Sequence, residues 1–476
     1  MEDLSSSFKD RRFLVVGLGR SGLSAAGLLR FLGADVVVSD DRDKKALAGM
    51  MGGLPEGIVF RPASAIDPAS EGIDEVVISP GIPMFHPLVK RALSSGIEVI
   101  GELELGFRVL MPFRIPWIGI TGTNGKSTTT RVTELMLKRA GRRILSGGNI
   151  GNAITGEILG GLRGGTLSTT EYVLVEISSF QLEGIRAFKP SVAVVLNISP
   201  DHLDRYEDLD EYIRTKAAIY RNQGPEDTLV LNLGDENLRC FAGGTGSKVR
   251  YFSVDSGTGG EAGAITPDAY VDEGWLFLRS ENGPERIIRI DDMRIRGIHN
   301  QENALAALLI SSLCGVTPDS QAPVLREFKG LEHRMEFVDE VEGVSFYNDS
   351  KGTNIGAVMK SLDGFGDGVI LILGGKYKGG DFSGLKRYIG RRMKAAVLVG
   401  EARGNILKQM GNPLCAYLVD DMDEAVVRAF SLAERGDTVL LSPGCASFDM
   451  FDDFEHRGRH FKELVRKLKG GMNVRV

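Results

Sequence analysis

The hydrophobic positions of the chain follow two patterns that alternate from one end to the other. Apolar runs of strand length, such as FLVVG and YVLVE, are followed by amphipathic stretches of helical length, such as SGLSAAGLLRFLG. This alternation is typical of α/β domains with mostly parallel sheets. Because 476 residues are too many for one ordinary hydrophobic core, we predict an α/β protein of three domains.

Breaks in the pattern predict the domain boundaries. The prolines of MPFRIP would interrupt a helix, so a Rossmann-like domain is expected over 1–110. A central domain with a mostly parallel sheet is expected over 111–330, with an antiparallel appendage between 252 and 294. A second Rossmann-like α/β domain, over 331–476, would close with a long helix from about Phe448 to Leu468.

Composition and charge narrow the class of protein. With 42% hydrophobic and 25% charged residues, the chain has the balance of a soluble globular protein. A net charge of -6 disfavours nucleic acids and membrane surfaces as partners. No apolar run approaches the ~20 residues of a membrane helix. The four scattered cysteines form no CxxC pair, which favours a reducing compartment. We expect a cytoplasmic protein that binds no nucleic acid and does not insert into membranes.

The segment WIGITGTNGKSTTT carries the strongest chemical signal. A strand leads into a turn with Gly122 and Gly125, and a helix is expected to begin near Ser127. Such glycines let backbone N–H groups point at phosphate oxygens, Lys126 adds a positive charge, and Ser127 can bind Mg²⁺. The GxxxxGK[ST] pattern fails by one residue. It requires a glycine five residues before Gly125, where Ile120 stands, and the glycine is at 119. The alternative is a surface turn rich in glycine and threonine. We favour a P-loop ATPase-like central domain that binds ATP.

A second glycine motif, VVGLGRSG, follows the first strand and opens a helix, with Asp40 and Asp41 about one βαβ unit later. This arrangement is typical of dinucleotide binding, but the same turn serves any pyrophosphate, including that of a UDP-sugar. A purely structural tight turn is the third interpretation. Ser79 and Gly81, at the end of a later strand, would line the same crevice, because ligands of open α/β sheets lie beyond the strand carboxyl ends.

Several motifs in one order resemble the Mur ligase family. They are TGTNGKST, EISSFQLE, NISPDHLDRY, HNQEN, the HR pair at 333–334, and YNDSKGTN. The resemblance covers nearly the whole chain. With the opening GLGRSG and the closing SPGCASFDMFDDFEHRG, the chain is most similar to the member that adds D-glutamate to UDP-N-acetylmuramoyl-L-alanine. The DNPR motif of the diamino-acid-adding branch is absent from the sequence.

The resemblance implies a cytoplasmic, ADP-forming ligase of peptidoglycan precursor synthesis. ATP would activate the alanine carboxylate as an acyl phosphate, which the amine of D-glutamate would then attack. The implied cofactor is Mg²⁺, with Mn²⁺ as a substitute. The partners would be the small-molecule substrates alone, and a monomer is expected.

Two residues of the central domain are candidate metal ligands. Glu176 ends an apolar strand, where a carboxylate can hold Mg²⁺ beside the γ-phosphate; a strand-end glutamate that faces water is the alternative. His202 follows another strand, in the loop SPDHLDR, and would bind the metal or the substrate. A lone histidine usually does neither, so for His202 the resemblance carries the assignment.

Lys216 occupies an unusual position. In DEYIRTKAAIY it shares the apolar stripe with Tyr212 and Ile219, at helical spacings of three and four residues. One interpretation is a snorkelling side chain whose amine reaches water. In the family the matching lysine is carbamylated by CO₂, which makes it a carboxylate-like Mg²⁺ ligand. Burial would favour this reaction by lowering the pKa of the amine.

The resemblance assigns each remaining candidate residue to one of the three substrates. The alternatives are a helix cap for Asn300 and ordinary surface or ion-pair roles for the other residues. Lys376 competes with Lys378 for the charged contact to the amino acid. The ATP contacts are Gly122, Thr123, Asn124, Gly125, Lys126, Ser127, Thr128, Asn300, Asn303, Arg334, Asp349 and Lys351. The UDP-precursor contacts are Gly19, Arg20, Ser21, Asp41, Arg42, Ser79, Gly81, Asn149 and Ser178. The D-glutamate contacts are His202, Thr353, Lys378, Ser447 and Phe454, and the metal ligands are Ser127, Glu176, His202 and Lys216.

Three rival functions remain at this stage. A sister Mur ligase or a folylpolyglutamate synthetase would use the same chemistry, although the N-terminal glycine turn disfavours the folate enzyme. An NAD-dependent oxidoreductase would use the first glycine motif but has no role for GTNGKST. A P-loop switch or partner-driven ATPase would hydrolyse ATP without a small-molecule product, so that ADP release would not depend on an amino acid.

Overall fold

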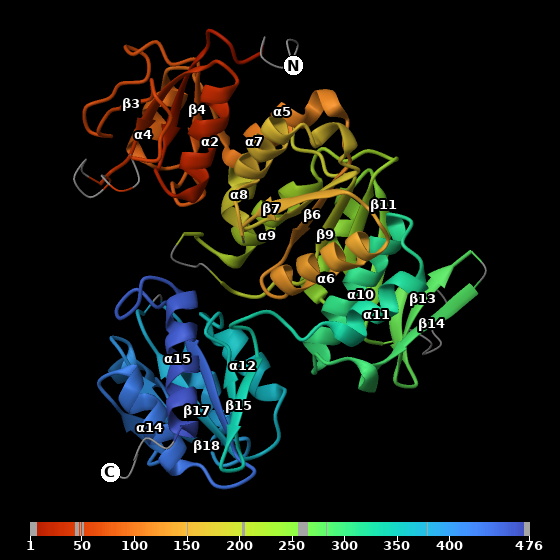
Figure 1. Cartoon of the computed structure of the whole chain (residues 1–476), viewed down its shortest axis with the longest axis vertical. Helices are drawn as coiled ribbons and strands as arrows, with labels where there is room; N and C mark the ends of the chain where they lie inside the picture. Colours follow the sequence, from red (N-terminus) through yellow and green to blue (C-terminus); the bar gives the residue numbers. More distant parts are fainter. Residues whose placement is uncertain are drawn as a thin grey trace. The chain divides into compact units, whose positions relative to one another are not determined.

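Three β-sheets organise the chain in the computed structural model (Figure 1), which describes residues 7–42, 47, 49, 52–149, 151–201, 205–255, 265–281, 283–377 and 379–470. The chain divides into two compact units. The first unit contains the first two sheets, and the second unit contains the third. Mostly parallel sheets confirm the predicted α/β class, whereas the boundaries at 110 and 330 stay predictions.

The first sheet is parallel throughout, in the order β3-β2-β1-β4-β5. Its central strand reads RFLVV because a parallel strand is covered on both faces and needs apolar side chains on each. Leu14, Val37, Val76 and Leu88 belong to one buried cluster on this sheet. The elements are β1 (Arg12–Val16), α2 (Arg20–Phe31), β2 (Asp35–Ser39), β3 (Val59–Phe60), β4 (Glu75–Ile78), α4 (Pro87–Ser94), β5 (Glu98–Gly101), α5 (Glu102–Leu110) and η1 (Met111–Phe113).

The second sheet has the order β14-β13-β12-β11-β10-β9-β6-β8-β7. Neighbouring strands from β12 to β7 run parallel, while β13 pairs antiparallel with both β12 and β14. The predicted antiparallel appendage is therefore confirmed for its described residues, as an extension of the sheet edge. The strands are β6 (Trp117–Thr121), β7 (Ile144–Gly148), β8 (Tyr172–Glu176), β9 (Val192–Val195), β10 (Thr228–Asn232), β11 (Lys248–Ser253), β12 (Ala269–Asp272), β13 (Trp275–Ser280) and β14 (Gly283–Arg289).

The helices around the second sheet also join it to the first. Helix α7 contacts both α2 and α5, so the two sheets share one helical layer within the first unit. The helices of this part are α6 (Lys126–Arg139), α7 (Ile154–Gly164), η2 (Leu167–Thr169), α8 (Ser179–Glu183), α9 (Leu209–Ala217), η3 (Ala218–Tyr220), η4 (Glu236–Gly244), η5 (Ile290–Asp292), α10 (Ile298–Leu313) and α11 (Pro318–Glu327).

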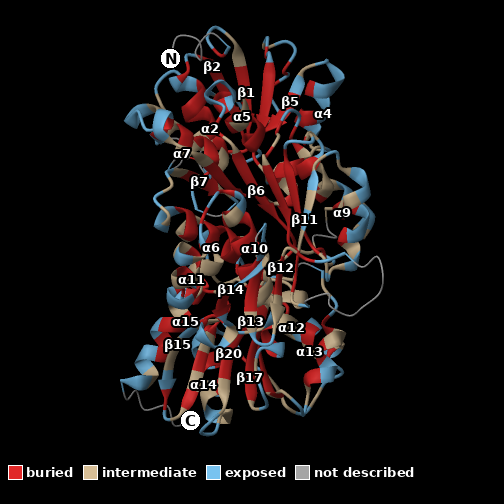
Figure 2. Cartoon of the chain, turned by 90° about the vertical axis from the view of Figure 1, so that its right-hand side faces the viewer, coloured by how far each residue is buried: buried red, intermediate tan, exposed pale blue. Residues whose placement is uncertain are grey.

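The third sheet has the order β15-β16-β20-β17-β18-β19 and is parallel except for the β15–β16 pair. Two buried clusters lie on it, one packed with α14 and α15 and the other with α12 and α13. Figure 2 shows the strands β17 and β20 coloured largely as buried. The elements are β15 (Glu336–Val341), β16 (Val344–Asn348), α12 (Ile355–Asp363), β17 (Val369–Gly374), η6 (Phe382–Tyr388), β18 (Met393–Val399), α13 (Arg403–Gln409), β19 (Ala416–Leu418), α14 (Met422–Leu432), β20 (Thr438–Gly444) and α15 (Phe454–Lys469).

The closing helix begins later than its sequence pattern suggests. The prediction of a start near Phe448 is wrong, because α15 begins at Phe454. The Asp453 carboxylate accepts a hydrogen bond from the backbone N–H of His456 at 2.6 Å and so caps the helix. Within the described part of the chain, no helix has the length and apolarity needed to cross a membrane.

Candidate active site

The glycine turn between β6 and α6, residues 122–125, is the core of the candidate nucleotide site and is called the phosphate loop below. Gly122 and Gly125 have φ angles of 151° and 83°, a region that L-residues avoid. A Cβ at Gly125 would lie 2.2 Å from Oδ1 of Asn303 in α10, so this glycine also permits a close approach. The same Oδ1 accepts a hydrogen bond from Thr129 Oγ1 at 3.3 Å. The structure thus brings Asn303 to the phosphate loop, where the sequence analysis expected an ATP contact.

Two lysine ammonium groups meet at one carbonyl of the phosphate loop. Lys126 Nζ donates to the carbonyl oxygens of Gly122 (2.8 Å) and Thr123 (2.9 Å). Lys216 Nζ donates to Gly122 O at 3.0 Å and lies 4.7 Å from the ring centroid of Tyr212. Lys216 is only 1% exposed, so its amine points to the loop and not to water as a snorkelling side chain would. The positive charge of Lys126 at the loop suits phosphate oxygens.

Glu176 has the surroundings expected of a metal ligand. It is 2% exposed, its Oε1 accepts a hydrogen bond from Asn149 Nδ2 at 2.9 Å, and its Oε2 is buried with no hydrogen-bond partner among the described residues. Because β6 and β8 are parallel neighbours with Ile120 opposite Glu176, the carboxylate lies at the same sheet edge as the phosphate loop. A buried carboxylate oxygen without a donor is costly unless a cation binds it.

The residues present fit Mg²⁺ better than a cation bound entirely by protein. The described residues contain no cluster of three or more His, Cys, Asp or Glu side chains that could hold a metal. Mg²⁺ typically takes one or two carboxylates together with substrate phosphates and water. Glu176 and the buried hydroxyl of Ser127 match that requirement. Of the other two predicted ligands, Lys216 lies at the phosphate loop and His202 lies outside the described residues.

Asn197, which the sequence analysis did not single out, clamps the phosphate loop. Its Oδ1 accepts a hydrogen bond from Asn124 N (2.8 Å), its Nδ2 donates to Asn124 O (3.1 Å), and its backbone O accepts from Thr123 N (2.9 Å). Asp235 in turn accepts a hydrogen bond from the N–H of Ile198 at 2.7 Å. The available signal was the position of Asn197, which closely follows the strand VAVV.

Asn149 and Ser178 lie at the ends of the strands next to the phosphate loop. Asn149 pairs with Glu176 through its backbone N–H as well as its side chain. Ser178 caps α8 in a reciprocal capping box with Gln181. Thr123 Oγ1 lies 3.2 Å from the hydroxyl of Tyr212.

Asn300 is inside α10 and donates to the carbonyl of Arg296 at 2.8 Å, so the alternative of a helix cap at Asn300 is wrong.

The glycine turn after β1 is closed by contacts within the first sheet. Ser79 Oγ donates to the carbonyl of Gly17 at 2.7 Å. A Cβ at Gly22 would lie 1.9 Å from that carbonyl oxygen, so this glycine is required for close packing of α2 on β1. Gly19 and Arg20 are exposed, and a Cβ at Gly19 would meet nothing within 4 Å. The open side of the turn is therefore at Gly19 and Arg20, with Ser21 next in α2.

The acidic residues after β2 are already paired. Asp40 accepts hydrogen bonds from the Leu18 N–H (2.7 Å) and from Arg42 Nε and Nη2 (both 2.8 Å). Burial acts to raise the pKa of Asp40, but the hydrogen bonds from Arg42 and Leu18 outweigh it and lower this pKa to about 2. Asp41 lies 3.1 Å from His86 Nε2. A strand-end acid that is fully used in this way is poorly suited to bind the ribose of NAD.

Asp349 is the central acid of the second unit. It follows β16, and its Oδ2 accepts hydrogen bonds from Ser361 Oγ and Ser442 Oγ, both at 2.8 Å. Burial raises the pKa of Asp349 to about 6, although these hydrogen bonds and the nearby charge of Arg334 oppose the shift. The structure therefore brings Arg334 and Asp349, two of the predicted ATP contacts, into one environment.

Lys351, Thr353 and Phe454 also lie together in the second unit. The ammonium of Lys351 is 3.8 Å from the ring centroid of Phe454, a cation–π contact. Thr353 donates its backbone N–H to the carbonyl of Lys351 at 2.8 Å. Ser447 is buried, and the adjacent Ala446 pairs with Lys376 through two backbone hydrogen bonds. Lys378 lies outside the described residues, so its competition with Lys376 stays open.

Arg457, which the sequence analysis did not single out, holds this group of segments together. Its guanidinium is fully buried and donates to the carbonyls of Ser350, Cys445 and Ala446 at 2.8 to 3.2 Å, and to Ser350 Oγ at 3.0 Å. Burial lowers the pKa of Arg457 to about 10, so it stays charged near neutrality. A buried arginine cannot be told from an exposed one by the amphipathic pattern of FEHRGRHF alone.

Comparisons with known proteins cover most of the chain. Three family models match it: "Mur ligase MurD-like, N-terminal domain" over residues 11–101, "Mur ligase middle domain" over 120–311 and "Mur ligase, glutamate ligase domain" over 333–445. These matches confirm the predicted organisation in three domains.

The chain is similar over nearly its whole length to curated relatives. It is 38% identical to the UDP-N-acetylmuramoylalanine–D-glutamate ligase of Caldanaerobacter subterraneus subsp. tengcongensis, with 97% of this chain and 99% of the relative covered. It is 40% identical to the ligase of the same name from Pelotomaculum thermopropionicum, with 98% and 99% covered.

Solved structures share the fold. The UDP-N-acetylmuramate-alanine ligase of Thermotoga maritima superposes with a TM-score of 0.58 at 19% identity, covering 96% of this chain and 99% of that one. Such a likeness supports the fold alone. Together with the three matched domains and the identity to full-length relatives, it leads to one conclusion. The chain belongs to the Mur ligase family.

Proposed function

We propose that the protein is an ATP-dependent ligase that joins D-glutamate to UDP-N-acetylmuramoyl-L-alanine, with release of ADP and phosphate. The observation that carries this proposal is the identity of 38–40% to ligases of that name over almost the full length of both chains. The phosphate loop supports the ATP dependence, since a glycine turn with a lysine beside it is the kind of loop that binds nucleotide phosphates.

In the first step the alanine carboxylate of the precursor attacks the γ-phosphorus of ATP, and ADP leaves. Lys126 and the N–H groups of the phosphate loop bind the phosphates, and Asn303 supports the loop from α10. Glu176 and Ser127 would hold Mg²⁺, which neutralises phosphate charge when bound. The further proposed ATP contacts are Gly122, Thr123, Asn124, Gly125, Thr128, Asn300, Arg334, Asp349 and Lys351.

In the second step the amine of D-glutamate attacks the acyl carbon, and phosphate leaves as the amide forms. Two carboxylates of the amino acid require cations and hydroxyls, because apolar walls alone would leave their charges unpaired. We assign this task to Thr353, Ser447 and the predicted contacts Lys378 and His202, and we propose Phe454 as a packing contact of the amino acid. The short distance from Phe454 to Lys351 supports a charged site at this end of the third sheet.

The precursor is assigned to the first sheet. The exposed Gly19 and Arg20 leave the open side of the turn available to a pyrophosphate. Arg42, whose guanidinium bonds Asp40, is proposed as a second contact. Ser21, Asp41, Ser79 and Gly81 complete the proposed set, with Asn149 and Ser178 near the reacting end of the precursor. The saturation of Asp40 by its own neighbours favours a UDP-linked ligand over NAD.

Lys216 is proposed to carry a CO₂-derived carbamate. Its amine is buried against the phosphate loop, and burial disfavours the ammonium form and so exposes a nucleophilic free base. Lys216→Ala should inactivate the enzyme, and acetate should restore part of the activity by occupying the vacated space. Labelling with ¹³C-bicarbonate should give a carbamate NMR signal in the wild type and none in the variant. An active Lys216→Ala enzyme, or no label in the wild type, would exclude the carbamate.

The decisive test of the function is phosphate release with ATP and Mg²⁺, scanning UDP-muramoyl precursors against amino acids. We expect turnover only with UDP-N-acetylmuramoyl-L-alanine and D-glutamate together. Use of L-lysine or meso-diaminopimelate would move the enzyme to a sister ligase. Phosphate release without any amino acid would indicate an ATPase, and hydride transfer with NAD an oxidoreductase.

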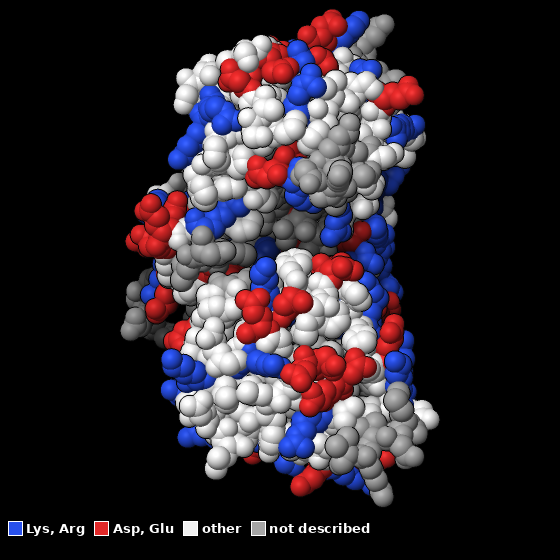
Figure 3. Space-filling model, turned by 90° about the vertical axis from the view of Figure 1, so that its left-hand side faces the viewer, with Lys and Arg blue, Asp and Glu red and all other residues white. Residues whose placement is uncertain are grey.

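The partners are proposed to be these small molecules, and the location cytoplasmic, where ATP and UDP-linked precursors are available. On the face drawn in Figure 3, basic and acidic side chains alternate over short distances, which does not suit a polyanion. We propose that the active form is a monomer, which light scattering of the purified enzyme would test.

A further inference from the structure

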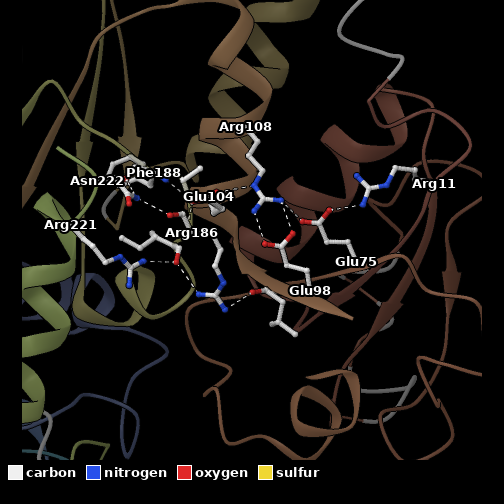
Figure 4. A network of polar contacts seen from close by, with 12 residues as sticks. Arg11, Glu75, Glu98, Glu104, Arg108, Arg186, Phe188, Arg221 and Asn222 are labelled. Atoms are coloured by element: carbon white, nitrogen blue, oxygen red, sulfur yellow. Dashed lines mark hydrogen bonds and ion pairs between the residues drawn. The ribbon is translucent and has the colours of Figure 1, made fainter. Parts of the chain in front are cut away.

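A buried carboxylate joins the first sheet to the segment that follows α8. Glu104, in α5, has no exposed surface. Its two oxygens accept hydrogen bonds from three consecutive backbone N–H groups, those of Arg186, Ala187 and Phe188, each at 2.9 Å. Arg108 Nε donates to the same carboxylate at 2.8 Å. Figure 4 shows Glu104 between Arg108 and the segment with Arg186 and Phe188.

The backbone of residues 185–188 is hydrogen-bonded on two sides. Glu104 accepts from its N–H groups, and side chains near the second sheet donate to its carbonyl oxygens. Asn222 Nδ2 donates to the carbonyl oxygens of Arg186 (2.8 Å) and Phe188 (2.9 Å), and Arg221 donates to that of Ile185 at 3.0 Å. Both of these partners belong to the part of the chain around the second sheet. A side chain at 104 with fewer acceptor oxygens would leave at least one of these N–H groups, of which that of Phe188 is buried, without its acceptor. Losing the acceptor of a buried N–H costs more than the hydrogen bond itself contributes.

Two further contacts close the same junction. Gly101 N donates to Gly184 O at 2.8 Å, and a Cβ at Gly184 would lie 2.5 Å from Gly101 N, so the two backbones touch. Glu102 Oε1 accepts hydrogen bonds from both the N–H and the hydroxyl of Thr155, at 2.8 and 2.7 Å. The end of β5 and the start of α5 are therefore fastened to the part of the chain around the second sheet by three contacts, at Gly101, Glu102 and Glu104.

The junction lies one short helix away from the candidate metal ligand. Gly184 directly follows α8, and Ser178, which caps α8, comes two residues after Glu176. Five helical residues span only about 8 Å. A rigid spacer of that length therefore connects the carboxyl end of β5, in the proposed precursor-binding sheet, to the end of β8 beside the phosphate loop.

We propose that Glu104 is a positioning residue: by fastening the first sheet to residues 186–188, it sets the distance between the bound UDP precursor and the phosphate loop. The kinetic effect of this residue rests on the proposed function. The fastening of the two segments by Glu104 does not depend on that function. Without the carboxylate, the two sheets would move relative to one another, and the precursor's carboxylate would meet the γ-phosphate less often.

The test is Glu104→Gln, with Glu98→Gln as the matched control. Both residues accept hydrogen bonds from Arg108, but Glu98 is half exposed, and its described contacts are with Arg108. Glutamine keeps one acceptor oxygen, but its NH2 group would replace the second oxygen and face N–H donors that it cannot bond. We expect hydrogen exchange at the amides of 186–188 to accelerate about 10- to 100-fold and kcat/KM for the precursor to fall by a similar factor. In Glu104→Gln the affinity for ATP alone should change less than about twofold. In Glu98→Gln the exchange rates and kcat/KM should also change less than about twofold.

Unchanged exchange at 186–188 in a folded Glu104→Gln protein would overturn the fastening, and accelerated exchange with an unchanged kcat/KM would overturn the positioning role. If Glu104→Gln does not fold, Gly184→Ala opens the same junction from its other side, with Gly160→Ala, where a Cβ meets nothing within 4 Å, as its control. Gly184→Ala kinetics equal to those of Gly160→Ala would then refute the proposal. A wild type that does not ligate would refute the proposed function, while the exchange result would still decide the fastening.

Discussion

The two glycine turns of the first unit look alike in sequence but are built for different purposes. Both follow a buried strand and open a helix, VVGLGRSG after β1 and TGTNGKST after β6. In the first turn, Gly22 is needed because a Cβ would meet the Gly17 carbonyl at 1.9 Å. In the second, Gly122 and Gly125 are needed for their positive φ angles, and two lysine amines converge on the loop.

This difference shows why a glycine pattern alone cannot identify a phosphate site. The first turn satisfies its own polar groups, since Asp40 is paired with Arg42 and Ser79 bonds the Gly17 carbonyl. The second turn instead has a lysine beside it, Lys126, whose ammonium donates to the loop carbonyls of Gly122 and Thr123. Positive charge placed at the loop, and not the glycines, therefore distinguishes a candidate catalytic loop from a turn that serves packing and ligand approach.

The largest effect is expected at the lysine that only the second turn has. Lys126→Ala should lower turnover at least ~100-fold, because it removes a preorganised charge from the phosphates. The melting temperature should change little, since the side chain is only partly buried. Lys138→Ala, on the exposed face of the same helix, is the control and should keep its activity. Near-normal phosphate release by Lys126→Ala would remove the distinction between the turns.

The next effect is on stability and belongs to the first turn. Gly22→Ala should lower the free energy of unfolding by about 3 kcal/mol, as expected for overpacking against rigid backbone. Gly19→Ala should have almost no effect on stability, because its Cβ would enter open space. Urea unfolding of both variants measures this difference. Equal losses for the two substitutions would show that the turn does not pack as described.

A pH dependence of about 2 kcal/mol is expected from Asp40. Its folded pKa of about 2 lies below the ordinary aspartate value of 3.8, so the carboxylate stabilises the fold above pH 4 and loses this contribution between about pH 4 and 2. Asp40→Asn should therefore be less stable than the wild type at pH 7, and the two should converge near pH 2. Thermal unfolding across this range provides the measurement. A constant difference at all pH values would mean that charge is not the cause.

The smallest effect is expected for the clamp on the second turn. Asn197→Ala removes two hydrogen bonds to Asn124 and should cost about 1 kcal/mol, or roughly a fivefold rise in KM for ATP, with kcat less affected. Asn237→Ala, whose side chain bonds the nearby Ile198 carbonyl, is the control and should leave KM for ATP within twofold. If kcat falls and KM does not, Asn197 acts in the chemical step and not as a clamp.

Much of the fold and the centre of the candidate site could be predicted from the sequence alone. Apolar runs predicted the parallel strands, because covered strands need apolar residues on both faces. TGTNGKST predicted the turn at 122–125, because its glycines and lysine are neighbours in the chain and their geometry is local. The motifs together indicated the family, whereas the apolar stripe around Lys216 left a snorkelling side chain open, and the structure shows the lysine buried.

Only the tertiary structure decided which polar groups meet. Glu104 reaches the amides of 186–188, Asn197 reaches the phosphate loop, and Arg457 reaches the carbonyls at 445–446 and Ser350. No spacing in the chain encodes these pairings, since a charged residue on a helix reads as a solvated one until a neighbouring segment covers it. Long-range burial therefore determined the partners, and local pattern determined the elements that carry them.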